Sequence, residues 1–199
     1  MSTVAVANQP RRVLADIIPA SLLANTLLVV GAAALVGVLA QISIPLGFTP
    51  VPITGQTLGV LLAGSVLGWR RAGLAMSVYV IAGMAGLPWF ADHASGYAMA
   101  TFGYLVGFVV AGTVLGWLAS RGSDRTVTRA VLSMVAGEAI IFAIAVPWLA
   151  VALHVSLAKA IALGFTPFIA GEFIKAAIAG VALPSAWRLV DRTSTSTND

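Results

Sequence analysis

Three charged residues lie inside the long apolar stretches of this chain: Glu138, Glu172 and Lys175. An ionisable side chain at the centre of a membrane helix costs about 2.5–3.5 kcal/mol on insertion scales, so such residues mark binding sites or transport pathways by default. Glu172 and Lys175 are three positions apart and therefore share a helix face. The pair predicts a site for a small ligand that carries both an N–H donor and a carboxylate. The alternative is that the two charges only neutralise each other.

Glu138 stands alone in its stretch, nine residues after Arg129, which places it roughly 13 Å into a bilayer at the helical rise. A carboxyl in that position is expected to keep its proton and to hydrogen-bond within the bundle. The sequence assigns it no further role. Nothing else in the apolar stretches could form a nucleophile–base pair or a metal cluster, because the chain has no cysteine and no histidine within a helical run. The sequence therefore predicts no catalytic residue, no metal site, no cofactor and no enzyme.

Polar side chains also gather in the segment 41–57, which carries three prolines within eight residues. Prolines this dense exclude a helix and favour a stiff, extended path. Apolar, non-helical backbone at membrane depth must lie against protein or a cavity. We expect the segment to pack into the outer opening of the bundle, with Thr54, Gln56 and Thr57 directed into it. The competing interpretation is that these side chains only cap the following helix.

A second segment, 86–97, combines aromatic and polar residues. Trp89 and Phe90 are candidates for stacking on a flat ligand, since aromatic side chains line apolar pockets. Asp92 is a candidate polar contact beside them. His93 is expected to be solvated, because one histidine beside one aspartate is too little for a metal site.

The elements that carry these residues are six apolar stretches. They are approximately Ser21–Ile44, Gln56–Gly68, Ala72–Pro88, Tyr97–Ala119, Val131–Leu153 and Phe165–Leu189. The chain is 59% hydrophobic and 9% charged, whereas soluble domains carry about 25% charged residues. The predicted fold is an all-α integral membrane protein, a compact bundle of six transmembrane helices (residues 21–190) between a polar lead (1–20) and a disordered tail (191–199).

The arginines all fall on alternate joints between these stretches. They precede the first stretch, join the second to the third and the fourth to the fifth, and end the sixth. The positive-inside rule then places both termini in the cytoplasm and the joints near 44–55, 89–97 and 154–164 outside. The net charge of +4 is explained by these loop anchors, so no nucleic-acid partner is expected. On the first helix, Ala33 and Gly37 form a small-xxx-small pair that predicts close approach of another helix, within the bundle or from another membrane protein.

The segment Q-I-S-I-P-L-G-F-T-P-V-P-I-T-G-Q-T at 41–57 resembles the signature of the BioY family of biotin transporters. Further matches follow in order along the chain: Leu61–Gly64, Gly86–Ala91, Gly103–Phe108, Pro147–Leu149 and Gly171–Lys175. The resemblance covers about residues 30 to 190, and its first motif is long and specific. The sequence departs from the family at Met99–Tyr104 and Asp92–Gly96, where expected glycines and a proline are replaced.

This resemblance implies the substrate-binding S component of an energy-coupling factor transporter, located in the bacterial plasma membrane. It implies a biotin pocket near the outer face, with Glu172 and Lys175 binding the ligand and Tyr104 joining the aromatic wall. It also implies a transmembrane coupling subunit that contacts Ala33 and Gly37, together with ATP-binding subunits. The chain itself has no G-x-x-x-x-G-K-[ST] motif.

The sequence leaves three alternatives open. The ligand could be another small vitamin, although the proline-rich segment argues against this. The chain could work as a solitary transporter, as a homo-oligomer without ATPase partners. A purely structural membrane protein would leave the Glu172–Lys175 pair and the stiff outer segment without a purpose.

Overall fold

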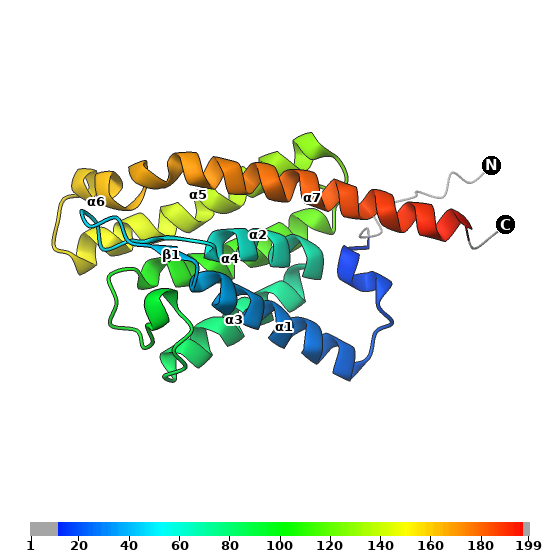
Figure 1. Ribbon diagram of the computed structural model, residues 1–199, viewed down its shortest axis with the longest axis horizontal. Helices are drawn as coiled ribbons and strands as arrows, with labels where there is room; N and C mark the ends of the chain where they lie inside the picture. The colour runs from blue at the N-terminus through cyan, green and yellow to red at the C-terminus, as the bar shows by residue number, and fades with distance from the viewer. Residues whose placement is uncertain (1–11, 197–199) are drawn as a thin grey trace, which may run out of the picture.

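The computed structural model describes residues 12–196, with side chains up to residue 192, and is built almost entirely of helices (Figure 1). In chain order the elements are η1 (Leu14–Ile17), α1 (Leu22–Ala40), β1 (Ser43–Ile44), β2 (Ile53–Thr54), α2 (Gln56–Leu67), α3 (Trp69–Met84), η2 (Ala91–His93), α4 (Phe102–Ala119), α5 (Val127–Ala152), α6 (Leu157–Gly164), η3 (Thr166–Phe168) and α7 (Ile169–Ser196). The three η elements are short 3-10 helices.

Several of these helices are long and apolar enough to cross a membrane. Within residues 12–196 there are four such stretches, namely α1, α4, α5 and the span Leu157–Arg192 that contains α6 and α7. The remaining two long elements, α2 and α3, have 12 and 16 residues, fewer than the roughly 20 that a bilayer core requires. The chain is therefore a multi-pass helical membrane protein, as predicted. The count of six spans and the cytoplasmic position of both termini stay predictions.

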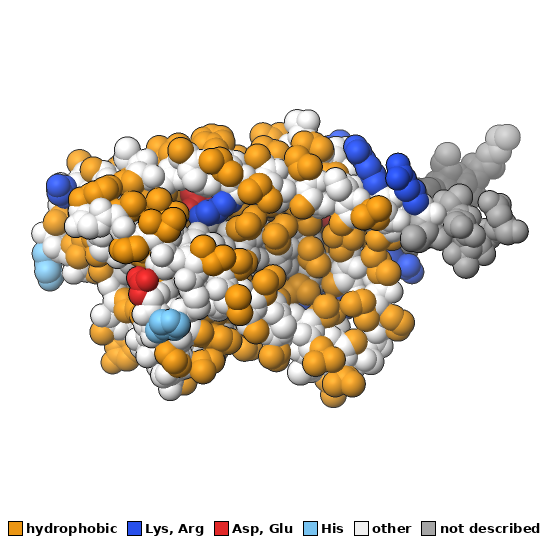
Figure 2. All heavy atoms as spheres, in the orientation of Figure 1, with side chains coloured by type: hydrophobic (Ala, Val, Ile, Leu, Met, Phe, Trp, Pro, Cys, Tyr) orange, Lys and Arg blue, Asp and Glu red, His pale blue; other side chains and the backbone are white. Residues whose placement is uncertain are grey.

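Helix α4 lies at the centre of the bundle and packs against α2, α3 and α5, while α7 packs on α5 and α2. The α4 side chains Phe108 and Leu115 are among the largest that are fully buried. Helix α1 lies at the edge against α2 and α3, and its outer face is strongly exposed, with Leu22 at 86% and Val38 at 66%. Figure 2 shows hydrophobic side chains spread over the whole visible face, as expected for a surface in lipid.

The joint expected as a plain loop at 154–164 contains the short helix α6. Ser156 caps it by accepting a hydrogen bond from the Lys159 backbone N–H, which is 3.3 Å away. Eight residues with a polar cap give too short a periodic pattern to be separated from a loop by sequence. Pro167 lies in the 3-10 turn η3, and α7 begins two residues later at Ile169.

The proline-rich segment 41–57 follows the extended path that its composition predicts. Strands β1 and β2 pair antiparallel, with Ser43 opposite Thr54. The hairpin folds back onto the bundle, because Val51 is only 5% exposed and the Thr49 hydroxyl donates to the Leu163 carbonyl of α6 at 2.8 Å. The segment thus covers one end of the bundle and connects α1, α2 and α6; we call it the outer hairpin after its predicted position.

Two glycines let the second outer segment pack tightly on the helices. A Cβ at Gly83 would lie 2.0 Å from the Phe90 ring, and one at Gly37 would lie 3.1 Å from the Trp89 ring. Ala33, one turn before Gly37, has no exposed surface. The expected partner-contact surface at Ala33 and Gly37 is therefore corrected, because both residues lie inside this chain. Small residues signal close approach, and here the approaching group is the chain's own tryptophan.

The arginine-bearing joints meet at one end of the bundle. Arg71, at the α2–α3 joint, forms a 2.8 Å ion pair with Asp16 of η1. Arg125, at the α4–α5 joint, donates to the Arg12 backbone carbonyl at 3.0 Å. In Figure 2 several basic side chains gather at this end of the bundle, while others lie near its middle and at the opposite end. This convergence agrees with the single-sided arginine distribution of the sequence.

A closed polar contact lies at the same end, which we call the Arg125 cluster (Asp124, Arg125 and Trp187). The Arg125 guanidinium stacks 3.3 Å from the Trp187 ring centroid. The Trp187 indole N–H donates to the Asp124 carboxylate at 2.5 Å. Burial raises the pKa of Asp124, while the hydrogen bond from Trp187 and the charge of Arg125 oppose that rise.

Candidate functional site

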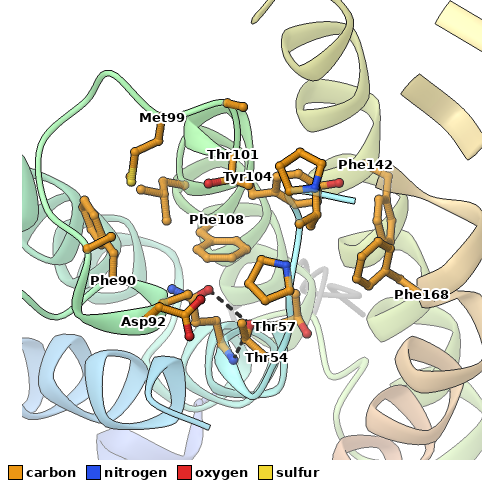
Figure 3. A pocket seen from close by; sticks show the side chains of 18 of the residues that line it. Thr54, Thr57, Phe90, Asp92, Met99, Thr101, Tyr104, Phe108, Phe142 and Phe168 are labelled. Atoms are coloured by element: carbon orange, nitrogen blue, oxygen red, sulfur yellow. Dashed lines mark hydrogen bonds between the residues drawn. The ribbon is translucent and has the colours of Figure 1, made fainter. Parts of the chain in front are cut away.

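A cavity of about 290 Å³ opens under the outer hairpin, where four parts of the chain meet (Figure 3). The hairpin and α2 form one side, the segment 90–94 a second, α4 a third, and α5 with η3 and α7 the fourth. Its lining comprises Pro50, Val51, Pro52, Thr54, Gln56, Thr57, Phe90, Ala91, Asp92, Ala94, Met99, Ala100, Thr101, Tyr104, Leu105, Phe108, Phe142, Phe168 and Glu172. Most of this surface is apolar, with polar groups from only a few positions. That composition is typical of a pocket for a small organic ligand.

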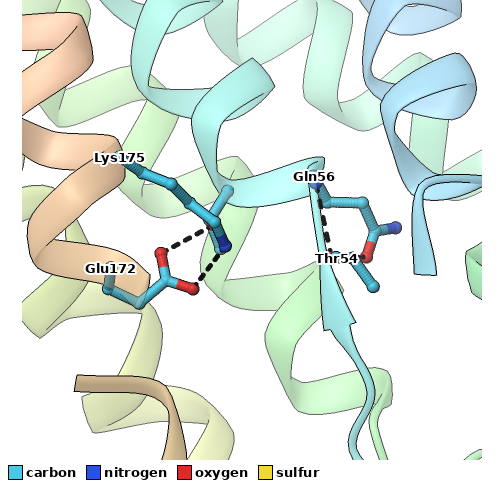
Figure 4. Close-up of polar contacts among 5 residues, drawn as sticks. Thr54, Gln56, Glu172 and Lys175 are labelled. Atoms are coloured by element: carbon cyan, nitrogen blue, oxygen red, sulfur yellow. Dashed lines mark hydrogen bonds and ion pairs between the residues drawn. The ribbon is translucent and has the colours of Figure 1, made fainter. Parts of the chain in front are cut away.

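The charged wall of the cavity is a three-residue contact between α2 and α7, which we call the Glu172 cluster (Thr57, Glu172 and Lys175; Figure 4). The Lys175 Nζ donates to Glu172 Oε1 at 2.6 Å and to the Thr57 hydroxyl at 2.8 Å. The Thr57 hydroxyl in turn donates to Glu172 Oε2 at 2.7 Å. Glu172 is only 8% exposed, so an uncompensated charge would be costly here, and the closed triangle of contacts provides the compensation.

The Glu172 cluster retains unused hydrogen-bonding capacity. A carboxylate offers about four lone-pair sites, and the two contacts to Glu172 leave about two of them free. An ammonium carries three N–H donors, and Lys175 uses two of them. The cluster can therefore accept from one ligand group and donate to another without breaking its own contacts.

A second polar group holds the hairpin side of the cavity in place. The Gln56 side-chain N–H donates to the Tyr79 hydroxyl at 2.5 Å. The Gln56 carbonyl accepts from the Thr54 hydroxyl at 3.1 Å. The Tyr79 hydroxyl then donates to the Trp89 backbone carbonyl at 3.2 Å. Gln56 and Thr54 line the cavity as predicted, and their contacts tie α2, α3 and the second outer segment together.

Aromatic rings form the apolar walls. Phe90 faces Phe108 across one part of the cavity, while Tyr104, Phe142 and Phe168 surround the other (Figure 3). The Tyr104 ring lies edge-on to Phe142, with 6.0 Å between ring centroids. Its hydroxyl donates to the Gly164 carbonyl, so Tyr104 offers a ligand its ring and has its hydroxyl occupied.

The predicted site residues fall into three groups. Those that line the cavity are Thr54, Gln56, Phe90, Asp92, Tyr104 and Glu172. Lys175 reaches the cavity wall through its contacts with Thr57 and Glu172. Trp89 lies behind the wall, where its indole N–H donates to the Tyr79 carbonyl at 2.9 Å. Asp92 is exposed and has a left-handed backbone (φ 57°), which places it at the cavity edge.

The sequence prediction missed several members of the aromatic wall. Phe168 lies four residues before Glu172, and Phe142 lies four residues after Glu138, so each shares a helical face with a buried acid. That spacing is a usable signal. Phe108, in α4, gave no such signal because its whole helix is apolar. Thr57 was expected to face the opening, and its two contacts show that it belongs to the charged wall.

An apolar cavity inside a helical membrane bundle, closed by a buried acid–lysine pair, defines an integral membrane protein that binds a small molecule. The chain belongs to the BioY family, whose match extends over residues 10–192.

Curated relatives support the same family. The biotin transporter BioY of Rhizobium etli is 36% identical over 148 residues, which cover 69% of this chain and 79% of that protein. The biotin transporter BioY of Thermotoga maritima is 40% identical over 151 residues, covering 74% and 86%. The biotin transporter BioY2 of Lactococcus lactis is 36% identical over 154 residues, covering 76% and 82%.

The fold also has a solved counterpart. It is similar to the crystal structure of the S-component for biotin from an ECF-type ABC transporter, with a TM-score of 0.75. The two share 20% sequence identity over 83% of this chain and 92% of that one. At this identity the similarity establishes the arrangement of helices.

Proposed function

We propose that this chain captures biotin at the outer opening of the bundle and serves its uptake as the substrate-binding subunit of a transporter. The observation that carries the proposal is the Glu172 cluster in the wall of an aromatic cavity. Glu172 lines the cavity and keeps free acceptor sites, and Lys175, which is bonded to Glu172 and Thr57, keeps one N–H donor. The relatives are named as biotin transporters, and the similar fold is that of a biotin S-component.

The chemistry of biotin suits these groups. Its ureido ring has two N–H donors and one carbonyl acceptor, and its chain ends in a carboxylate. Glu172 accepts from a ureido N–H, and the remaining N–H of Lys175 donates to an acceptor of the ligand. The fused ring packs against Phe90 and Phe108. A site built this way rejects analogues that lack the N–H group, because Glu172 would then stay partly unpaired.

Energy for transport is proposed to come from other chains. The sequence has no phosphate-binding motif of the P-loop type, so a transmembrane coupling subunit and ATP-binding subunits are the proposed partners. The membrane is proposed to be the bacterial plasma membrane, with both termini in the cytoplasm. Because Ala33 and Gly37 are buried, a coupling subunit would have to contact other residues.

Equilibrium binding of labelled biotin to the detergent-purified chain tests the proposal. We expect saturable binding without ATP and with one ligand per chain. Unlabelled biotin should displace the label, whereas thiamine and riboflavin should not. Saturable binding of either of those vitamins, with no binding of biotin, would contradict the proposed substrate while leaving the family assignment intact.

A further inference from the structure

A second cavity of about 200 Å³ lies between α5 and α7, directly behind the Glu172 cluster. Phe142 and Glu172 line both cavities, so they form part of the wall between them. The remaining lining residues are Val135, Glu138, Ala139, Phe165, Ile169, Phe173 and Ala176. Four of these (Val135, Ala139, Ile169 and Phe173) are exposed on the outer surface of the bundle, so the cavity opens toward lipid and not toward the outer hairpin.

Glu138 is the one member of this lining whose polar atoms are unpaired. It is 7% exposed, and neither of its carboxyl oxygens has a hydrogen-bond partner among the described residues. Apart from Glu172, the cavity around it is apolar. An ionised carboxylate without a partner is strongly disfavoured in such surroundings. Glu138 therefore needs a proton, a cation or a hydrogen-bond donor close by.

The charged groups around Glu138 come from α7. Glu172 lines the same cavity as Glu138, and the Lys175 ammonium is bonded to Glu172. Helices α2 and α4 contribute no Asp, Glu, Lys, Arg or His, and the Tyr104 hydroxyl of α4 is bonded to Gly164. On α6, Lys159 is exposed. The local group thus consists of two carboxylates and one ammonium.

Two carboxylates that share one cation in a low-dielectric site do not both stay ionised. Glu172 is the one that keeps its charge, because it accepts hydrogen bonds from Lys175 and Thr57. The proton therefore resides on Glu138. Glu172 still has a free lone pair beyond the one that a ligand would take, and it lines the same cavity as Glu138, so it is available to accept from that proton.

We propose that protonated Glu138 is a positioning residue of the ligand site, which donates toward Glu172 and keeps the Glu172–Lys175 pair ionised and oriented. This inference rests on the proposed biotin site. Once Glu138 loses its proton, the two carboxylates compete for Lys175, and both ligand contacts weaken. Glu138 itself touches no ligand, and it acts only through Glu172.

Two neutral substitutions separate hydrogen bonding from packing. Glu138→Gln keeps an N–H donor that cannot titrate, whereas Glu138→Leu has a similar volume and no donor. We expect the Gln variant to bind biotin within about twofold of the wild type at neutral pH, and the Leu variant to bind about tenfold more weakly. Val135→Ala, which alters the same cavity without touching the carboxyls, is the matched control and should bind as the wild type does.

The pH profile supplies a readout that packing alone would not change. As the pH is raised above neutral, wild-type affinity should fall more steeply than that of Glu138→Gln, because only the wild type can lose a proton at this position. Any loss due to Lys175 is common to both proteins. Coinciding profiles, or equal affinities of the Gln and Leu variants, would overturn the proposal.

A ligand-free measurement distinguishes this proposal from the proposed function. The thermal midpoint of the wild type should drop more with rising pH than that of Glu138→Gln, since ionising the buried carboxyl destabilises only the wild type. If biotin fails to bind at all while the midpoints behave this way, the proposed substrate is wrong and the protonated Glu138 stands. Parallel midpoint curves reject the proton on Glu138 whatever the ligand is.

Discussion

Among the described residues, a buried acid lies beside a cation in two clusters, and these clusters differ in what surrounds them. In the Glu172 cluster, at the end covered by the hairpin, the pair lies in the wall of a 290 Å³ cavity. In the Arg125 cluster, at the arginine-bearing end, the guanidinium lies against an indole ring and the carboxylate accepts from the same ring's N–H. None of the three residues of this second cluster lines either of the two cavities described above.

The difference shows how one pair of residue types can serve two purposes. The tryptophan of the Arg125 cluster occupies the space and the hydrogen bonds that a ligand would use, so that cluster joins helices. In the Glu172 cluster the short threonine side chain bridges the two charges and leaves the cavity side open. The comparison predicts that changes in the Glu172 cluster alter biotin affinity, whereas changes in the Arg125 cluster alter stability and leave affinity unchanged.

The largest effect is expected for Glu172→Ala and Lys175→Ala. Each removes a charge-assisted contact to the ligand and leaves its partner unpaired, which corresponds to about 1.5–3 kcal/mol, or roughly ten- to a hundredfold weaker biotin binding. The double variant should lose less than the two effects added, because the residues act as one unit. Biotin titration of monodisperse protein is the measurement. Near wild-type affinity in both single variants would place the pair in the scaffold.

A comparable loss of stability is expected for Trp187→Phe, with biotin affinity unchanged. The phenyl ring still offers a face to Arg125, but the buried Asp124 carboxylate loses its indole donor, which costs about 1–3 kcal/mol. Thermal unfolding in detergent measures the first effect, and biotin titration measures the second. An affinity loss as large as that of Lys175→Ala would remove the distinction between the two clusters.

Thr57→Val tests the bridge within the Glu172 cluster. Valine keeps the shape and removes the hydroxyl, so both of its hydrogen bonds, to Glu172 and from Lys175, are lost. Because biotin senses this loss only through the positions of the two charges, we expect an effect of about 0.5–1.5 kcal/mol, equivalent to roughly two- to tenfold in biotin affinity. Thr57→Ser retains the hydroxyl and serves as the control. Equal affinities of the Val and Ser variants would show that the charges hold their positions without the bridge.

The smallest effect is expected for Asp124→Asn, and it depends on pH. Burial raises the pKa of Asp124, so its contribution to stability is fully present below the pKa of an unfolded aspartate and is lost as the pH rises through the folded value. Asparagine can still accept from Trp187 and does not ionise. The variant should therefore unfold at or above the wild-type temperature at neutral pH, and this advantage should disappear below about pH 4. Lower stability of the variant at neutral pH would contradict the assignment.

The sequence was sufficient for those parts of the fold that depend on long apolar stretches and on proline. All six predicted stretches contain a helix, and the prolines of segment 41–57 correctly excluded one there. It was insufficient for α6, whose eight residues lie below the length at which periodicity can be recognised. It also misassigned Ala33 and Gly37, because a row of small residues reveals close approach without identifying what approaches.

For the site, the most informative residues were those whose side chains are energetically unfavourable in an apolar segment. Glu172 and Lys175 were found because charges are rare in apolar helices, and Thr54 and Gln56 because polar groups followed a stiff proline-rich segment. Phe108 could not be found, since a phenylalanine that lines a cavity has the same sequence signature as one that faces lipid. Trp89 was predicted to line the cavity wall. Its packing against Gly37, which the sequence does not reveal, places it behind that wall.

The Gln41 side chain connects helix α1 to the segment that contains Trp89 and Phe90. Its Nε2 donates to the carbonyl of Gly37 on α1 at 3.0 Å, and to those of Trp89 and Phe90 at 3.1 Å each. Helix α1 is the helix at the edge of the bundle, while Phe90 lines the cavity. A tilt of the C-terminal end of α1 would therefore move the Phe90 segment with it. A force applied to this helix from the lipid side would in this way displace one wall of the cavity.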